Sequence, residues 1–282
     1  MIKQWITVQG TAEWNEDAVI INEANKIYGV VDGATSIVPF RGKNNETGGR
    51  LASQSLKTYF ESILPGESRS LEELLNEANR RLGQEMQSYG ISTTDELWTA
   101  AIAAVRITET HIEFVQSGDC LLFAIYKDGS IRSVCRDHIA PIELDALRIW
   151  QQGIAEGIRS KAELWEKVLP QLVENKRKMN TPEGYSVING RPDAELYLES
   201  GKLNRVQLKE LLLITDGLYF PGTKTASQHH QTDDLVRQMT SMGLEEYAQW
   251  LTALEHEDEQ CIRYPRFKTS DDKSAIWIDL TN

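Results

Sequence analysis

Acidic side chains recur at the ends of apolar, β-type segments along the whole chain. Asn15-Glu16-Asp17 precedes one such run, and Asp32-Gly33 and Asp216-Gly217 each follow one. Asp271-Asp272 precedes the last apolar segment. Because a strand end is a rigid support, carboxylates gathered there repel one another unless a hard cation lies between them. The pattern therefore indicates a Mg²⁺ or Mn²⁺ site, and such sites commonly act on phosphate esters.

No single acidic pair is specific. An Asp-Gly pair is typical of a turn, and Lys127-Asp128-Gly129-Ser130 predicts a hairpin with a type I′ turn, in which both central residues take positive φ angles. Glu16-Asp17 alone is typical of a solvated acidic pair. Asp32-Gly33 and Asp216-Gly217 differ from the hairpin pair, because no closely matching return strand follows either of them. The set as a whole carries the prediction of a metal site.

The composition restricts the classes of partner. The 282 residues carry a formal net charge of −12, with 40% hydrophobic and 26% charged residues. These fractions are ordinary for a globular protein. The net charge argues against nucleic acid and anionic membrane surfaces as partners. It would also repel a phosphate substrate, unless bound metal ions reverse the field locally.

The sequence also favours a cytoplasmic location. The longest apolar runs fall far short of the roughly 20 residues that span a bilayer, and the first residues lack the pattern of a signal peptide. Three cysteines, Cys120, Cys135 and Cys261, show no metal-ligand spacing. We expect them to be buried thiols in a reducing compartment.

The order of the elements predicts an α+β fold with antiparallel sheets covered by helices, because strands cluster instead of alternating with helices. Alternating or β-branched apolar residues predict strands, and apolar residues at helical spacing predict helices. Ser70-Leu-Glu-Glu73 is a capping box that begins the second helix. The predicted strands are 2–8, 18–21, 27–31, 99–107, 111–116, 120–126, 130–134, 194–198, 211–215 and 274–280; the predicted helices are 48–64, 70–89, 141–179, 231–242 and 244–255.

In its order of motifs the chain resembles the metal-dependent Ser/Thr protein phosphatases of type 2C (the PPM family), as a divergent, bacterial-like member. The resemblance spans residues 15–276, nearly the whole chain. Each short motif is weak, and the set in family order is strong. The matching motifs are Asn15-Glu16-Asp17-Ala18, Val30-Val31-Asp32-Gly33, Gly48-Gly49, Ser117-Gly118-Asp119, Arg136-Asp137-His138, Thr215-Asp216-Gly217 and Asp271-Asp272-Lys273-Ser274.

This resemblance implies a single phosphatase-like domain over residues 1–282, with a variable helical or flap insertion at about 141–195. It implies an α-β-β-α arrangement of four layers, in which two antiparallel sheets form a central sandwich flanked by helix pairs. It also implies two Mn²⁺ or Mg²⁺ ions and a weaker third ion at one end of the sandwich. Oxygen-only ligands suit these metals better than Zn²⁺.

The resemblance assigns a role to each acid. Asp32 would bridge both metals, the Gly33 carbonyl and Glu16 would hold one of them, and Asp216 and Asp271 would hold the other. Asp119 would form the third site together with Asp216. Asp17 would orient a metal-bound water, which makes Asp17 and Asp32 the candidate catalytic residues.

Three positions depart from the family pattern. Ala12 stands where the family has an Arg that binds the substrate phosphate, and losing such a charge-assisted contact costs on the order of 1.5–3 kcal/mol. Arg41, or Lys43 in the same loop, is a candidate replacement. The segment after Asp32-Gly33 lacks the His that some members have, and Asp272 replaces a common Asn, which adds a negative charge near the metals.

The sequence thus predicts a metal-dependent phosphomonoester hydrolase that dephosphorylates phosphoserine or phosphothreonine proteins through water activated by two metal ions. One alternative is a catalytically weak or inactive phosphatase-like module that binds a regulatory partner. Another is a phosphatase for a small metabolite. The retained acids argue against the binding module, because it has no need of mutually repelling groups.

Overall fold

The computed structural model describes residues 1–34, 36–221 and 228–281, with the backbone alone for residues 228–231. Within these residues, ten strands form two five-stranded antiparallel sheets. The first sheet has the order β1 (Ile2–Val8), β10 (Lys273–Asp279), β9 (Leu208–Ile214), β6 (Leu121–Tyr126) and β7 (Ile131–Ser133). The second has the order β2 (Asp17–Asn22), β3 (Ile27–Ala34), β4 (Thr99–Ile107), β5 (His111–Ser117) and β8 (Glu199–Asn204).

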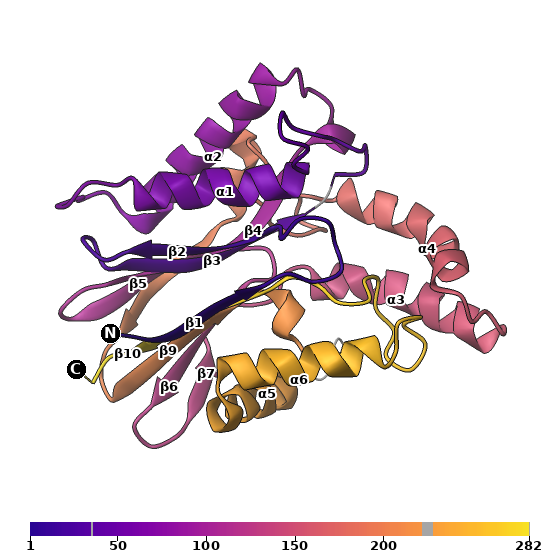
Figure 1. Cartoon of the computed structure of the whole chain (residues 1–282). Helices are drawn as coiled ribbons and strands as arrows, with labels where there is room; N and C mark the ends of the chain where they lie inside the picture. The colour runs from indigo at the N-terminus through magenta and orange to yellow at the C-terminus, as the bar shows by residue number, and fades with distance from the viewer. Residues whose placement is uncertain (35, 222–227, 282) are drawn as a thin grey trace.

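The two sheets lie face to face, and a pair of helices covers each outer face (Figure 1). Helices α1 (Gly48–Glu61) and α2 (Leu71–Ser88) cover the second sheet, and α5 (Gln228–Met242) and α6 (Leu244–His256) cover the first. Helices α3 (Ala140–Ala155) and α4 (Lys161–Lys176) lie at one end of the sandwich, away from both termini. The predicted α+β sandwich with four layers is therefore confirmed.

Side chains on the two faces of each central strand enter different cores. In β3, Val30 packs between the sheets, and its neighbour Val31 packs against α1 and α2. Successive side chains of a strand point to opposite faces, so a strand covered on both sides needs a continuous apolar run. A third core, which includes Phe123 and Tyr247, joins the first sheet to α5 and α6. These runs end where the acidic residues begin.

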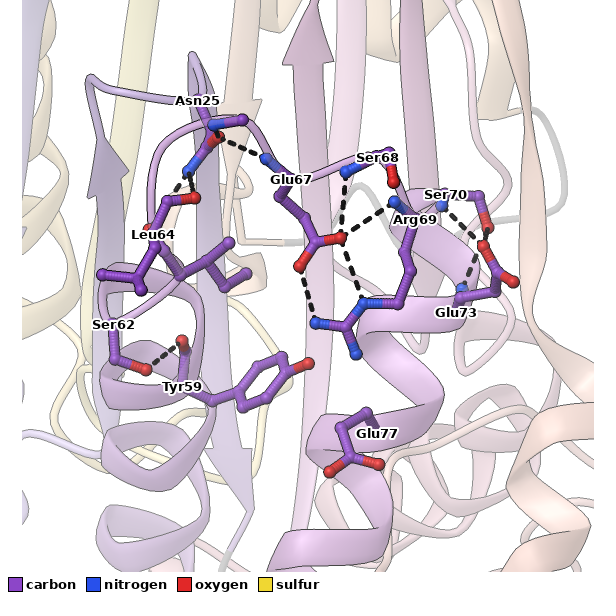
Figure 2. Close-up of polar contacts among 12 residues, drawn as sticks. Asn25, Tyr59, Ser62, Leu64, Glu67, Ser68, Arg69, Ser70, Glu73 and Glu77 are labelled. Atoms are coloured by element: carbon purple, nitrogen blue, oxygen red, sulfur yellow. Dashed lines mark hydrogen bonds and ion pairs between the residues drawn. The ribbon is translucent and has the colours of Figure 1, made fainter.

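The connection between α1 and α2 confirms the predicted capping box (Figure 2). The Ser70 hydroxyl accepts a hydrogen bond from the Glu73 amide at 3.1 Å, and the Glu73 carboxylate accepts one from the Ser70 amide at 2.7 Å. Just before it, the Glu67 carboxylate accepts hydrogen bonds from two backbone amides and from the Arg69 guanidinium. These contacts fix where α2 begins.

The hairpin between β6 and β7 is real, but the predicted type I′ turn is wrong. Gly129 has a φ of +81°, whereas Asp128 is not among the residues with positive φ. The Asp128 carboxylate instead accepts hydrogen bonds from the Ser130 amide at 2.9 Å and from its hydroxyl at 2.7 Å. The aspartate therefore stabilises the turn through its side chain, and only the glycine takes the left-handed conformation.

Two further segments differ from the prediction. Residues 141–179 are not one helix, because α3 ends at Ala155 and Gly157, with a φ of +100°, separates it from α4. Residues 194–198 are not a strand: all but Leu198 fall in a 3₁₀ helix, η2 (Pro192–Tyr197), and the strand β8 follows at Glu199–Asn204. Two other 3₁₀ turns are η1 (Thr94–Glu96) and η3 (Asp216–Leu218).

Helix length and polarity also bear on a membrane location. Over the residues that the structure describes, none of the helices combines the length and apolar character required to cross a bilayer.

Candidate metal-dependent active site

The hairpin of β2 and β3 brings two acids together. Asp17 and Asp32 are directly paired in the antiparallel register, at the end of the hairpin where its apolar runs stop. The Gly33 amide donates a hydrogen bond to the Glu16 carbonyl at 3.1 Å, which continues the pairing by one residue. Asp17 and Glu16 are buried, and Asp32 is partly exposed. The hairpin therefore places the acidic residues of its two strand ends beside one another.

Glycines at the start of α1 let the Glu16 carboxyl group approach the Gly33 carbonyl. A Cβ atom on Gly49 would lie 2.8 Å from both the Glu16 carboxyl group and the Gly33 carbonyl oxygen. A Cβ atom on Gly33 would lie 2.0 Å from the Gly49 carbonyl oxygen. No larger residue fits at either position without displacing backbone, so this corner brings together two oxygen-bearing groups that are predicted to be metal ligands.

The other two acids come from the first sheet. Strands β9 and β10 pair, and the Thr215 amide donates to the Ser274 carbonyl at 2.9 Å, so Asp216 lies beside the residues that precede β10. A Cβ atom on Gly217 would lie 1.8 Å from the Asp272 carbonyl oxygen and 3.3 Å from the Asp271 Cβ. This close approach holds Asp216 and Asp271 at the same end of the sandwich.

Asp272 binds backbone amides, a role that the sequence does not predict. Its two carboxylate oxygens accept hydrogen bonds from the backbone amides of Gly10 and Glu16, each at 2.7 Å. The residue thereby ties the start of β10 to the segment that carries Glu16. The predicted extra negative charge is present, but its oxygens are bound by amides.

Asp119 reaches the cluster from the turn between β5 and β6. Gly118 takes a φ of +84° in this turn, and its amide donates to the Ser186 hydroxyl at 3.0 Å. His138 contacts the same hydroxyl through Nδ1 at 2.6 Å, which supports a structural role for this histidine. The Tyr219 hydroxyl donates to the Asp119 carbonyl at 2.6 Å. These contacts fix the backbone that carries Asp119.

The electrostatics show how crowded the acids are. Burial raises the pKa of Asp32 well above its usual range, and the nearby charges of Asp17, Asp216, Asp271 and Asp119 raise it further. Burial likewise raises the pKa of Asp17. The hydrogen bond from Thr215 lowers this pKa, and the charges of Asp271 and Asp272 raise it further. Four acids that are distant in the sequence therefore act on Asp32 at once.

The arrangement fits hard divalent cations. The donors are oxygen atoms alone, and the buried Asp17 Oδ1 has no hydrogen-bond partner. Nevertheless, in the part of the chain that the structure describes, no three His, Cys, Asp or Glu side chains are already grouped so that they could hold a metal ion. Several carboxylates are engaged by protein donors: Glu16 by the Thr47 hydroxyl, Asp17 by Thr215 and Asp271 by Lys268. A bound cation would replace some of these contacts.

The acids open onto one cavity of about 630 Å³, which Asp32, Asp119, Asp216 and Asp271 help to line. Much of the rest of its lining is apolar. Helix α4 contributes Trp165, Leu169 and Leu172 to this apolar part of the lining. Part of the segment 141–195, which is predicted to be a variable insertion, thus lines the cavity.

Arg41, the predicted substrate-binding residue, lies elsewhere. Its guanidinium contacts the Glu13 carboxylate at 3.0 Å and the Asn45 carbonyl at 3.3 Å, and both charged side chains are about half exposed. Arg41 does not belong to the residues that line the cavity. Its predicted role in phosphate binding stays a prediction.

Lys268 lines the cavity beside the acids, which the sequence does not predict. Its ammonium contacts the Asp271 Oδ1 at 2.7 Å, and its side chain is 47% exposed. Burial disfavours its charge, but the carboxylates of Asp271, Asp32 and Asp216 outweigh this effect and raise the pKa of the Lys268 ammonium. The only signal in the sequence is a lysine three residues before the acidic pair.

A four-layer sandwich with acidic residues at its strand ends is the architecture that the resemblance to type 2C phosphatases implies. Residues 10–255 match the family model for protein phosphatase 2C, and the chain belongs to this family. No curated protein sequence matches the chain significantly.

Solved structures agree over nearly the full length. Serine/threonine phosphatase Stp1 from Staphylococcus aureus has a TM-score of 0.58 and 16% identity, over 100% of this chain and 96% of that one. The phosphatase PstP/Ppp from Mycobacterium tuberculosis has a TM-score of 0.56 and 15% identity, over 99% and 98%. The catalytic domain of PstP in complex with 2 manganese ions has a TM-score of 0.53 and 14% identity, over 98% and 96%. At these identities the likeness shows the fold.

Proposed function

We propose that this protein is a metal-dependent phosphomonoester hydrolase that acts on phosphoserine or phosphothreonine in proteins. The observation that carries the proposal is the convergence of Asp17, Asp119, Asp216 and Asp271 on Asp32 at the edge of a cavity. Such repulsion costs stability, which a hard cation offsets. Three buried free thiols favour a reducing, cytoplasmic location.

In this proposal the metal ligands are the acids around Asp32. Glu16, Asp32 and the Gly33 carbonyl would hold one Mn²⁺ or Mg²⁺ ion, and Asp32, Asp216 and Asp271 the second, with Asp119 and Asp216 for a weaker third. When bound, the ions would neutralise the phosphoryl oxygens and supply a reactive water near neutral pH. The Gly217 contact and the Gly33 and Gly49 corner keep these ligands in place.

Asp17 would act on the proton of the attacking water. The Thr215 hydroxyl holds Oδ2 at 2.8 Å, and Oδ1 has no partner. A carboxylate oxygen that no protein donor engages is open to a proton from water. Oδ1 is therefore the atom that would receive the proton.

The test is hydrolysis of p-nitrophenyl phosphate with Mn²⁺, with and without chelator, followed by phosphoserine and phosphothreonine peptides. We expect Asp32→Asn and Asp216→Asn each to lower turnover by about a hundredfold or more. Asp128→Asn is the matched control, because it changes another Asp-Gly pair in an exposed hairpin.

Unchanged turnover in either site variant would refute the ligand assignment. A folded wild-type protein without turnover at any metal concentration would favour the regulatory binding module. The engagement of Asp271 by Lys268 is the observation that favours this alternative. Turnover of small phosphate esters without turnover of phosphopeptides would favour a metabolite phosphatase.

A further inference from the structure

A phosphate anion that enters this cavity approaches a protein of net charge −12 and a rim of carboxylates. A cation on the protein would add to the attraction that any bound metal exerts on the anion. Three basic side chains line the cavity in the described part of the chain, Lys176, Arg266 and Lys268. Their contacts decide which one can receive an anion.

Arg266 has no donor left. Its Nε donates to the Thr269 carbonyl at 3.0 Å, and its Nη1 donates to the Asp258 carboxylate and the Tyr264 carbonyl, each at 2.8 Å. Its Nη2 donates to the carbonyls of Glu255 and Asp258, each at 2.8 Å. A guanidinium has five N–H groups, so all of them are used inside the protein.

Lys176 has other electrostatic partners. It is the last residue of α4, and the charges that act on it are those of Asp95 and Glu16. Glu16 is a proposed ligand of the first metal, and Asp95 does not belong to the cavity lining. The acids at which we place the second metal are not among the groups that shift the pKa of Lys176.

Lys268 remains, and it has the required geometry. Within the described residues, one contact engages its ammonium, the one with Asp271 at 2.7 Å, so two of its three N–H groups are available there. Its side chain is 47% exposed at the cavity and interacts electrostatically with Asp32 and Asp216. The Lys268 ammonium thus lies between the acids and the cavity.

The backbone on both sides of Lys268 is held firmly. Arg266 is fixed by the five hydrogen bonds described above, and the Thr269 hydroxyl donates to the Glu259 carbonyl at 3.1 Å. Lys161 of α4 donates to the same hydroxyl at 2.8 Å. A preorganised cation loses less conformational entropy on binding an anion than a side chain on a free loop does.

We propose that Lys268 binds the phosphate group of the substrate through the two free N–H groups of its ammonium. The inference rests on the proposed function, because it needs a phosphate ester in this cavity. It also offers a cation in place of the arginine that Ala12 lacks. Arg41, which is paired with Glu13 outside the cavity lining, is the competing candidate.

The test uses inorganic phosphate as the probe and calorimetry as the readout, with the full chain in saturating Mg²⁺. We expect Lys268→Met to weaken phosphate binding by about 10- to 100-fold, and Lys268→Arg to retain most of it. Lys202→Met is the control, because this exposed lysine of β8 lies outside the cavity lining, and we expect no change. Arg41→Met in the same assay tests the competing candidate.

The affinity for Mg²⁺ and Mn²⁺, measured by calorimetry without phosphate, separates a phosphate contact from damage to the metal site. We expect both Lys268 variants to bind the metals at least as tightly as the wild type. Equal phosphate affinity in the wild type and in Lys268→Met would overturn the inference. It would also be overturned if Lys268→Met lost metal and phosphate affinity in parallel, or if phosphate affinity fell in Arg41→Met alone.

If the wild-type protein binds metal and hydrolyses esters in any of these cases, the proposed function still stands. A wild type that binds neither metal nor phosphate overturns both proposals.

Discussion

At the scale of single residues, neighbouring acids of identical type have different tasks. Asp271 lines the cavity and contacts Lys268, whereas both oxygens of Asp272 bind backbone amides. The sequence predicts that both lie near the metals, because it gives the order of the acids and not the direction of each side chain. Lys268 escaped the sequence analysis for the same reason. Its ammonium reaches the acids only because of how the loop before β10 folds.

Gly217 offers a direct test of how closely the two halves of the cluster must approach. Its φ is not positive, so an alanine there is opposed by contacts and not by its backbone conformation, chiefly by the contact with the Asp272 carbonyl and also by the one with the Asp271 Cβ. We expect Gly217→Ala to lower the free energy of unfolding by about 1–3 kcal/mol, because backbone must shift to admit the methyl group. It should also weaken Mn²⁺ binding, because the shift separates Asp216 from Asp271. Urea unfolding and calorimetry measure the two effects.

Gly42→Ala is the matched control for this substitution. A Cβ atom there would meet the ends of the Glu46 and Leu51 side chains, which can move aside. Its effects on unfolding and on Mn²⁺ affinity should both be small. Equal losses in the two variants would mean that the Gly217 contact has no special role.

At the scale of elements, strongly patterned segments were predictable and weakly patterned ones were not. Strand β4 was predicted to the residue, because nearly every side chain along it is buried. Strand β8 was missed because Glu-Ser-Gly-Lys-Leu-Asn shows no apolar pattern, and it forms only by pairing with the edge of β5. Pro192 starts a 3₁₀ helix in place of the predicted strand at 194–198, and Leu196 there is 81% exposed. Pairing between strands that are distant in the sequence therefore decides where β8 forms.

A buried ion pair joins α6 to β10. The Lys273 ammonium contacts the Glu255 carboxylate at 2.7 Å, with 1% and 5% of the side chains exposed, and also donates to the Asp271 carbonyl at 2.9 Å. Lys273→Met should cost about 3–5 kcal/mol of stability, because it leaves the Glu255 charge buried without its partner. The double variant with Glu255→Met should lose much less. Urea unfolding of both single variants and the double variant gives the coupling energy.

The exposed ion pair of Arg148 with Asp145 in α3 is the control, at 2.7 Å. Arg148→Met should change the free energy of unfolding by less than about 1 kcal/mol. Equal stability of wild type and Lys273→Met would contradict the assigned role of the buried pair.

Two tryptophans of the α3–α4 insertion should separate stability from substrate binding. Trp150 is fully buried, and its Nε1 donates to the Cys261 carbonyl at 3.0 Å, whereas Trp165 is 39% exposed on the cavity wall. Trp150→Ala should cost about 3–5 kcal/mol. Trp165→Ala should change stability far less and raise KM for aryl phosphates. Thermal unfolding and steady-state kinetics of both variants test this, and an unchanged KM in Trp165→Ala would remove the wall from substrate binding.

At the scale of the whole molecule, a protein with a net charge of −12 attracts any divalent cation weakly, so metal binding alone does not locate a site. The acidic cluster differs from this diffuse attraction because burial and four neighbouring carboxylates act together on Asp32. A cation bound there stabilises the folded chain by RT ln(1 + [L]/Kd), about 2.7 kcal/mol at a hundred times Kd. We therefore expect Mn²⁺ to raise Tm by several degrees, and chelator to reverse the shift.

The variants decide whether that stabilisation belongs to the cluster. Asp32→Asn removes one charge from the centre of the repulsion, so the metal-free variant should unfold at a higher temperature than the metal-free wild type. The same substitution should abolish most of the rise in Tm with Mn²⁺, whereas Asp128→Asn should leave it intact. Diffuse attraction would be screened by 0.5 M salt, and a specific site much less so. A rise in Tm that persists in Asp32→Asn and disappears in salt would show that the cation binds the surface at large, and the carboxylates at the strand ends would then need an explanation other than a metal.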